Sequence, residues 1–266
     1  MSFAGKVCIV TGASSGIGRR TALDFAADGA EVCVVARREP LLVDLVEQMG
    51  GGSHSWVAAD VSVPEDIARI GAHVRARHGR CDVLVNNAGF SRPGSFAEDD
   101  ALEKLDDVMA TNFFGAARVT KELLPLLIDA APSSVVNVAS IAGRLALGGA
   151  GAYCASKFAL VGFSEALNFD LAPLGVHVGL VEPGPVPTEG FPQRDLLGDR
   201  FLRRAVSSAD EVSRAIRATA ARRKLQRVVP RGYHLLTIAR YISPPLYTFA
   251  QRRVLKDRAR ANMRAD

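Results

Sequence analysis

Short apolar runs alternate along most of this chain with longer stretches in which apolar residues recur at helical spacing. Such runs, bounded by glycine or polar residues, are typical of buried strands. We expect strands at Lys6–Thr11, Glu31–Ala36, Trp56–Ala59, Cys81–Val85, Val135–Ser140, Val176–Val181 and Arg227–Pro230. We expect helices at Thr21–Ala27, Leu41–Met49, Pro64–Arg77, Asp99–Pro125, Ala152–Leu171 and Ser208–Ala221. This alternation predicts an α/β fold, a doubly wound, Rossmann-like parallel sheet in a single domain.

A glycine-rich turn joins the first expected strand to the first expected helix. It reads Thr11-Gly12-x3-Gly16-x-Gly18. Glycines at such a turn let backbone N–H groups approach a phosphate closely, and the helix N-terminus favours its negative charge. The turn therefore predicts a site for a phosphate-bearing ligand.

Two arginines, Arg37 and Arg38, follow the second expected strand, which ends at Ala36. Many dinucleotide-binding folds place an acid here to bind the ribose 2′-hydroxyl of NAD. A guanidinium at this position would instead bind the 2′-phosphate of NADP. The pattern favours NADP(H) over NAD(H); the alternative is that both arginines begin a solvated helix.

Polar residues also follow the next two strands. Asp60 comes after the third strand, and Asn86-Asn87-Ala88-Gly89 comes after the fourth. In an open parallel sheet these positions lie on the ligand side. Ser62 and Glu65 are expected to form a capping box for the helix that begins at Pro64. Further on, Asn112 lies inside an expected helix, where a buried asparagine needs a partner.

Tyr153 and Lys157 are four residues apart on an expected helix, so they share one face. A cation beside a phenol favours the phenolate and lowers the tyrosine pKa from its usual value of about 10. Such a tyrosine could exchange a proton with a substrate oxygen. Taken alone, the pair also fits an ordinary helix surface.

Together these residues closely resemble the short-chain dehydrogenase/reductase family of NAD(P)-dependent oxidoreductases. The resemblance covers about residues 5–190. It rests on the glycine turn, Asp60, Asn86-Asn87-Ala88-Gly89, Asn112, Ser140, Tyr153-x3-Lys157 and Pro183-Gly184-x-Val186-x-Thr188. Each motif is common alone, and the specificity lies in their order.

The resemblance implies hydride transfer between NADP(H) and a carbonyl or secondary alcohol. Tyr153 would be the general acid/base, and Ser140 would polarise the substrate carbonyl. Lys157 would bind the nicotinamide ribose and lower the Tyr153 pKa, while Asn112 would hold a water in a proton relay. The implied cofactor-binding set is Gly12, Ser14, Ser15, Gly16, Ile17, Gly18, Arg37, Arg38, Asp60, Val61, Asn87, Ala88, Gly89, Tyr153, Lys157, Pro183, Gly184, Val186 and Thr188. The alternative is an NADP-binding regulator or scaffold without turnover.

We expect a Rossmann-like catalytic domain over residues 1–230, with a substrate lid at about 190–208, and a basic amphipathic extension over residues 231–266. Residues 222–266 carry 12 Lys and Arg against two Asp, whereas residues 1–221 carry 21 against 26 Asp and Glu. Contact with an anionic membrane surface, packing that closes the pocket, and a subunit contact all fit such an extension. Nucleic acid is a poor fit, because no recognition motif is present.

The apolar side chains of the lid and the amphipathic extension favour a hydrophobic substrate such as a lipid, fatty acyl or steroid-like carbonyl or alcohol. Leu145 and Leu147 point to the same kind of substrate. The family resemblance implies a homodimer or homotetramer. No signal peptide is visible, so we expect a cytoplasmic protein, with peripheral membrane association as the alternative. The four cysteines, Cys8, Cys33, Cys81 and Cys154, lack metal-ligand spacing, and we expect no metal site.

Overall fold

The computed structural model describes residues 1–187, 206–245 and 247–249 of the 266-residue chain. Within them, seven strands form one sheet in the order β3-β2-β1-β4-β5-β6-β7. The strands are β1 (Val7–Thr11), β2 (Glu31–Ala36), β3 (Ser55–Ala58), β4 (Val83–Asn86), β5 (Ser133–Val138), β6 (Val176–Pro183) and β7 (Gln226–Val229). Every neighbouring pair is parallel. The predicted doubly wound sheet in a single domain is confirmed.

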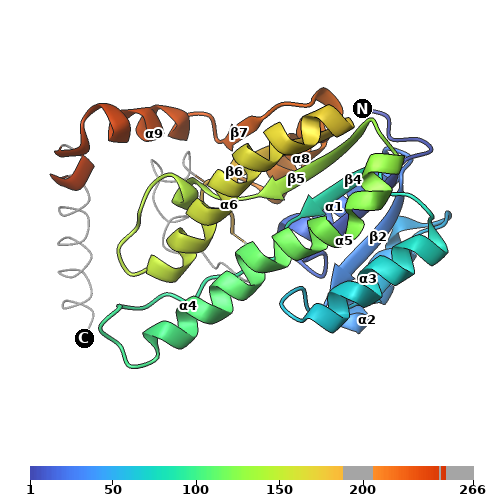
Figure 1. Ribbon diagram of the computed structural model, residues 1–266, viewed down its shortest axis with the longest axis horizontal. Helices are drawn as coiled ribbons and strands as arrows, with labels where there is room; N and C mark the ends of the chain where they lie inside the picture. The colour runs from blue at the N-terminus through green and yellow to red at the C-terminus, as the bar shows by residue number, and fades with distance from the viewer. Residues whose placement is uncertain (188–205, 246, 250–266) are drawn as a thin grey trace.

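Helices cover both faces of this sheet (Figure 1). One face carries α1 (Gly16–Ala27), α2 (Glu39–Met49) and α8 (Ala209–Arg222), and the other carries α3 (Pro64–Arg77), α5 (Ala116–Asp129) and α6 (Gly151–Leu171). Side chains alternate along a strand, so one strand serves both layers. In β1, Cys8 and Val10 pack into the first core, and Val7 and Ile9 pack into the second.

The strand order reverses between β1 and β4, which are neighbours in the sheet although β2 and β3 separate them in sequence. In open parallel sheets, ligands bind at such a reversal, beside the carboxyl ends of the strands. Here β1 ends at Thr11 and β4 ends at Asn86. The fold therefore brings the residues that follow, Gly12 and Asn87, to the same edge of the sheet.

The long helix expected over residues 99–125 is divided. It consists of α4 (Ala101–Met109), a π-helical segment (Ala110–Gly115) and α5. Pro125 lies inside α5 and does not end it. A proline costs a helix one hydrogen bond and some steric strain, but Leu126 and Leu127 beyond it are buried. Their burial offsets that cost.

The capping box expected from Ser62 and Glu65 is absent, so this prediction was wrong. Val63 is the N-cap of α3, and no side chain caps the helix there. Ser62 Oγ instead donates to Asp60 Oδ1 at 2.7 Å. Pro64 begins the helix, where its missing N–H leaves one donor fewer to satisfy.

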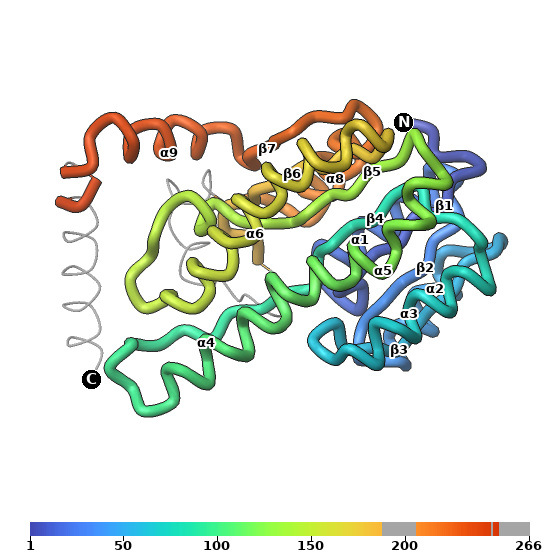
Figure 2. The backbone as a smooth tube through the Cα atoms, viewed as in Figure 1, coloured from blue at the N-terminus to red at the C-terminus, as the bar shows by residue number. Residues whose placement is uncertain are grey.

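The C-terminal part of the described chain lies beyond the sheet. After β7, the helix α9 (Tyr233–Ile242) lies at the end of the molecule opposite α2 and α3 (Figure 2). Across the described residues, we find no helix with the length and apolar character needed to span a bilayer.

Candidate active site

Two adjoining hollows lie at the carboxyl edge of the sheet. The larger, about 310 Å³, is lined by Gly12, Ser15, Gly16, Ile17, Asn87, Gly89, Ser140, Tyr153, Lys157, Pro183, Gly184 and Val186, among others. The smaller, about 280 Å³, adds Ser14, Arg37, Arg38, Asp60, Val61 and Ala88. The structure thus brings together most of the site residues predicted from the sequence. Gly18 and Asn112 lie behind the lining, and Thr188 lies outside the described residues, as does the expected lid apart from residues 206–208.

The glycine turn is held close to the end of β4. Gly12 adopts a left-handed conformation with φ of 65°, and a Cβ there would lie 2.7 Å from Ala88 Cα. At Gly18, a Cβ would lie 2.3 Å from the Gly12 carbonyl oxygen. Both positions therefore require glycine, because any larger side chain would push the turn away from its neighbours.

Asn87 fastens this turn from the neighbouring strand. Its side-chain amide donates to the carbonyl oxygens of Thr11 at 3.0 Å and Gly12 at 3.2 Å. Thr11 Oγ1 in turn accepts from the backbone N–H groups of Asn87 and Ala88. At the start of α1, Ser15 makes no side-chain cap, so the first N–H groups of the helix are left for an anion.

Charged side chains surround the smaller hollow. The Arg37 guanidinium lies 3.5 Å from an Asp60 carboxylate oxygen and is 72% exposed. Arg38 Nη2 donates to Ser14 Oγ at 3.1 Å. Partial burial raises the pKa of Asp60, but hydrogen bonds from Ser62 and the charge of Arg37 outweigh burial and leave that pKa below its ordinary value. Asp60 is therefore an anion at neutral pH. The side chains of Arg37 and Arg38 lie at the edge of the smaller hollow.

Ser140 and Tyr153 meet in the larger hollow. Ser140, which follows β5, accepts a hydrogen bond from Ala142 N at 3.1 Å. Burial raises the pKa of Tyr153 to about 12, while a hydrogen bond with Ser140 lowers it in part. The predicted lowering by Lys157 is not found. The ammonium nitrogen of Lys157 lies 5.8 Å from the Tyr153 ring centre and donates instead to the carbonyl oxygen of Val138 at 2.9 Å.

The side chains of Lys157 and Asn112 both lie close to Gly89. A Cβ at Gly89 would be 3.0 Å from Asn112 Oδ1 and 3.5 Å from Lys157 Nζ. Burial lowers the pKa of Lys157 to about 8. Asn112 is fully buried in the π-helical segment, where its amide donates to Phe90 O at 2.9 Å and Ser156 Oγ at 3.0 Å. The proton relay predicted through Asn112 stays a prediction.

A buried acid beside the site was missed at the level of sequence. Glu182, in β6, is fully buried, and its carboxylate pairs with Arg144 Nε at 2.8 Å and accepts from the side chain of Gln226. Arg144 also reaches Glu165 of α6 at 2.5 Å. This network fixes the loop after β5, which lines the site. The sequence offered one sign of this buried ion pair: Glu182 is an acid that directly follows the apolar run Val176–Val181.

Of the two leucines of that loop expected to shape the substrate side, only Leu147 does so. Leu147 lines the larger hollow and is 41% exposed. Leu145 is buried and does not line it. The apolar lining comes instead from Leu147 together with Ile141, Ala142, Ala150, Pro185 and Val186.

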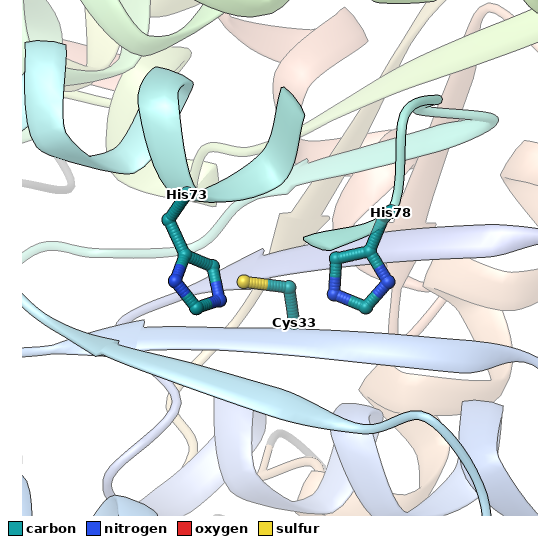
Figure 3. Close-up of side chains that lie close together, drawn as sticks. All are labelled: Cys33, His73 and His78. Atoms are coloured by element: carbon teal, nitrogen blue, oxygen red, sulfur yellow. The ribbon is translucent and has the colours of Figure 1, made fainter. Parts of the chain in front are cut away.

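A cluster of potential metal ligands lies away from this site, between the sheet and α3. Cys33, His73 and His78 place donor atoms within 4.8 Å of one another (Figure 3). The hydroxyl of Ser55 lies 2.7 Å from His78 Nε2 and 3.0 Å from His73 Nε2. Burial lowers the pKa of both histidines, which are neutral at pH 7. Hydrogen bonding to Ser55 accounts for this arrangement, and the expected absence of a metal site stays a prediction.

The comparisons with known proteins agree with this geometry. The short chain dehydrogenase family model matches residues 6–195. The zebrafish (Danio rerio) protein named dehydrogenase/reductase SDR family member 7B is 33% identical over 191 residues, which are 69% of this chain and 62% of that relative.

Solved structures extend the similarity to most of the chain. A short-chain dehydrogenase/reductase from Burkholderia phymatum in complex with NAD superposes with a TM-score of 0.81 at 29% identity, covering 92% of this chain and 96% of that chain. The Pseudomonas aeruginosa RhlG/NADP active-site complex gives 0.79 at 28% identity, covering 88% and 98%.

The fold and the side chains at the carboxyl edge of the sheet define an NAD(P)-dependent oxidoreductase. The chain belongs to the short chain dehydrogenase family.

Proposed function

We propose that this protein interconverts a carbonyl and a secondary alcohol on a hydrophobic substrate, with NADP(H) as its cofactor. The observation that carries the proposal is the meeting of two hydroxyl groups, those of Ser140 and Tyr153, in one hollow with the buried ammonium of Lys157. Two hydroxyl donors can share the charge that develops on one substrate oxygen.

The two adjoining hollows form a crevice that fits a dinucleotide. The turn at Gly12 lies close to Ala88, and the side chain of Ser15 does not cap α1, so the first backbone N–H groups of the helix are left for a phosphate. Bound NADP(H) supplies or accepts the hydride. Arg37 and Arg38 would bind the 2′-phosphate, and Asp60 and Val61 would contact the adenine. At the other end, Lys157 would bind the nicotinamide ribose; the proposed carboxamide contacts are Val186 and Thr188, the latter outside the described residues.

Tyr153 moves the proton in this mechanism. Its raised pKa keeps the phenol protonated at neutral pH, the form that donates to a carbonyl oxygen during reduction. Ser140 holds that oxygen with a second hydrogen bond. In the oxidation direction Tyr153 accepts the proton of the alcohol, a step that needs the phenolate and is therefore favoured at alkaline pH.

The apolar lining of the larger hollow supports a hydrophobic substrate. Ile141, Ala142, Leu147 and Ala150 present hydrocarbon beside the Ser140 and Tyr153 hydroxyls. Pockets of this kind gain affinity from each buried methylene of a ligand, by about 0.8 kcal/mol. We therefore expect preference for ketones or secondary alcohols on long chains or fused rings.

A substrate panel with NADPH and NADH tests the proposal. We expect NADPH oxidation with long-chain ketones, a lower kcat/KM with short ones, and loss of turnover in Tyr153→Phe. Equal kcat/KM for short and long ketones contradicts the hydrophobic pocket. Tight NADPH binding without turnover on any carbonyl or alcohol identifies an NADP-binding regulator instead.

A further inference from the structure

The helix α9 packs against the molecule with its polar side and presents its apolar side to solvent. Thr237 is buried and Arg240 is partly buried against the body. Leu235 is 71% exposed, Ile238 42% and Ile242 78%. At 3.6 residues per turn, these three fall on the side of the helix opposite Thr237 and Arg240. A helix that faces water has the reverse arrangement.

Specific contacts hold α9 in this orientation. Arg240 donates to the carbonyl oxygen of Arg144, and its guanidinium lies 5.0 Å from the Phe158 ring centre. Just beyond the helix, Tyr247 donates its hydroxyl proton to the carbonyl oxygen of Ala146 at 2.8 Å. The outward apolar face therefore follows from how the helix is anchored to the loop after β5.

A basic hollow of about 990 Å³ lies next to this helix, between α8 and β7, and leads to the first turn of α9 at His234. Its charged lining is Arg214, Arg222, Lys224, Arg227 and Arg231, with Glu211 the acid among its lining residues. Within the part of the chain that the structure describes, none of these five cations forms an ion pair. Among the described lining residues, these five cations therefore face one acid, Glu211.

Arg227 is the cation of this hollow with a buried, unsatisfied donor atom. Its Nε is buried and, among the described residues, has no hydrogen-bond partner. Burial and repulsion from Arg222 and Arg231 lower the pKa of Arg227. A buried donor that lacks a partner among the described residues and lies beside two like charges is the environment that an anionic ligand stabilises.

We propose that α9 and the basic hollow form a docking surface for a membrane that contains anionic phospholipid. Figure 1 shows β7, the turn that precedes it and α9 along one edge of the molecule. Phosphate headgroups would enter the hollow, and Leu235, Ile238 and Ile242 would enter the headgroup–acyl boundary. The sequence beyond the described residues, 250–266, adds six Lys and Arg against two Asp.

Two other occupants fit these observations less well. A second copy of the chain, related by a twofold axis, would bring two uncompensated cation clusters close together. Nucleic acid would satisfy the cations but leave the apolar face of α9 in water, because its backbone presents phosphate and sugar. An anionic bilayer matches both the charge and the hydrocarbon.

Flotation of the full-length protein with vesicles tests the proposal. We expect binding to vesicles of phosphatidylcholine with phosphatidylglycerol, weaker binding to phosphatidylcholine alone, and partial release by high salt. Ile238→Asp with Ile242→Asp, and separately Arg222→Glu with Arg231→Glu, should each lower the bound fraction at least about tenfold. Phe169→Asp is the matched control: Phe169 is 75% exposed on α6, and its change should leave binding unaltered.

Measurements in solution separate the outcomes. Thermal unfolding and NADPH oxidation with a dissolved ketone show whether each variant is folded and active. The proposal is overturned if the wild type stays in the soluble fraction with anionic vesicles. It is also overturned if the only effect of Ile238→Asp with Ile242→Asp is to convert a dimer into a monomer. A third contradicting result is that inorganic phosphate raises the unfolding temperature of the protein while vesicles do not bind it.

Discussion

The two ends of the dinucleotide crevice are built differently. At the reaction end, Lys157 is 4% exposed and Asn112 is fully buried, and both are held by hydrogen bonds from inside the fold. At the proposed adenosine end, Arg37 and Arg38 lie at the surface, with the Arg37 side chain close to Asp60 and the Arg38 side chain bonded to Ser14. Under the proposed function, the difference teaches that burial sets the protonation chemistry at one end, while surface charge sets cofactor choice at the other.

The strongest test of the reaction end is Tyr153→Phe. Removing the phenolic hydroxyl removes the proton donor, and we expect kcat to fall by about 10²–10⁴-fold with the fold intact. Initial rates of NADPH oxidation measure this loss. Tyr241→Phe, on an exposed tyrosine of α9, is the control and should keep full activity. If Tyr153→Phe kept more than half of the wild-type kcat, Tyr153 would not be the proton donor, and the proposed role of the buried reaction end would be wrong.

Lys157→Met tests whether burial at the reaction end costs stability. The native pKa is about 8, below the ordinary value of 10.5. Between these two pH values the unfolded state binds more protons than the native state, so wild-type stability rises with pH in this window. The wild type should gain about 3 kcal/mol relative to Lys157→Met as pH rises from below 8 to above 10.5.

Urea unfolding of both proteins at several pH values measures the Lys157 effect. Lys121→Met is the matched control for removal of an ammonium, because Lys121 is exposed on α5. A wild-type advantage that is constant with pH would show that the Lys157 ammonium is not penalised by burial.

The adenosine end is tested by Arg37→Ala and Arg38→Ala. Each change removes a proposed charge-assisted contact to the 2′-phosphate, and such a contact is worth about 1.5–3 kcal/mol. We expect kcat/KM for NADPH to fall about 10–100-fold per arginine, with little change for NADH. Arg75→Ala, on α3 and paired with Glu122, should affect neither cofactor. Equal losses with both cofactors would refute the assignment of these arginines to the 2′-phosphate.

A change away from both ends gives the smallest effect on activity. Ser55→Ala removes the hydroxyl between His73 and His78, leaving ring nitrogens of two partly buried histidines without that partner. We expect a loss of about 1–3 kcal/mol in unfolding free energy and an unchanged KM for NADPH. Chemical denaturation measures the first and initial rates the second. An altered KM for NADPH would show that the cluster of Cys33, His73 and His78 affects cofactor binding.

Much of the fold and the grouping of the candidate site could be predicted from the sequence, because both depend on local pattern and strand order. Apolar runs locate the strands, and parallel topology then gathers Gly12, Asp60 and Asn87 at one edge. The divided helix at Asn112 could not be predicted, since the shift to π-helical hydrogen bonds leaves no mark in apolar spacing.

The Tyr153 pKa also escaped prediction, because helical spacing places Lys157 nearby but says nothing of burial or of where Nζ points. The same holds for contacts between distant segments. Glu182 pairs with Arg144, and Cys33 lies close to His73, because the folded chain brings together segments that are distant in sequence.

The adjacent asparagines Asn86 and Asn87 connect the glycine turn to the helices and strands on the other side of β4 through hydrogen bonds. Asn86 Nδ2 donates to Thr120 on α5 and to Asn137 on β5, and Asn137 donates to Ser164 on α6. Asn87 fastens the glycine turn. The turn and the helix of Tyr153 therefore belong to one cooperative unit, so amide hydrogens in β1, β4 and α6 should exchange with a common opening free energy. Cofactor bound at the turn would raise that energy throughout the unit.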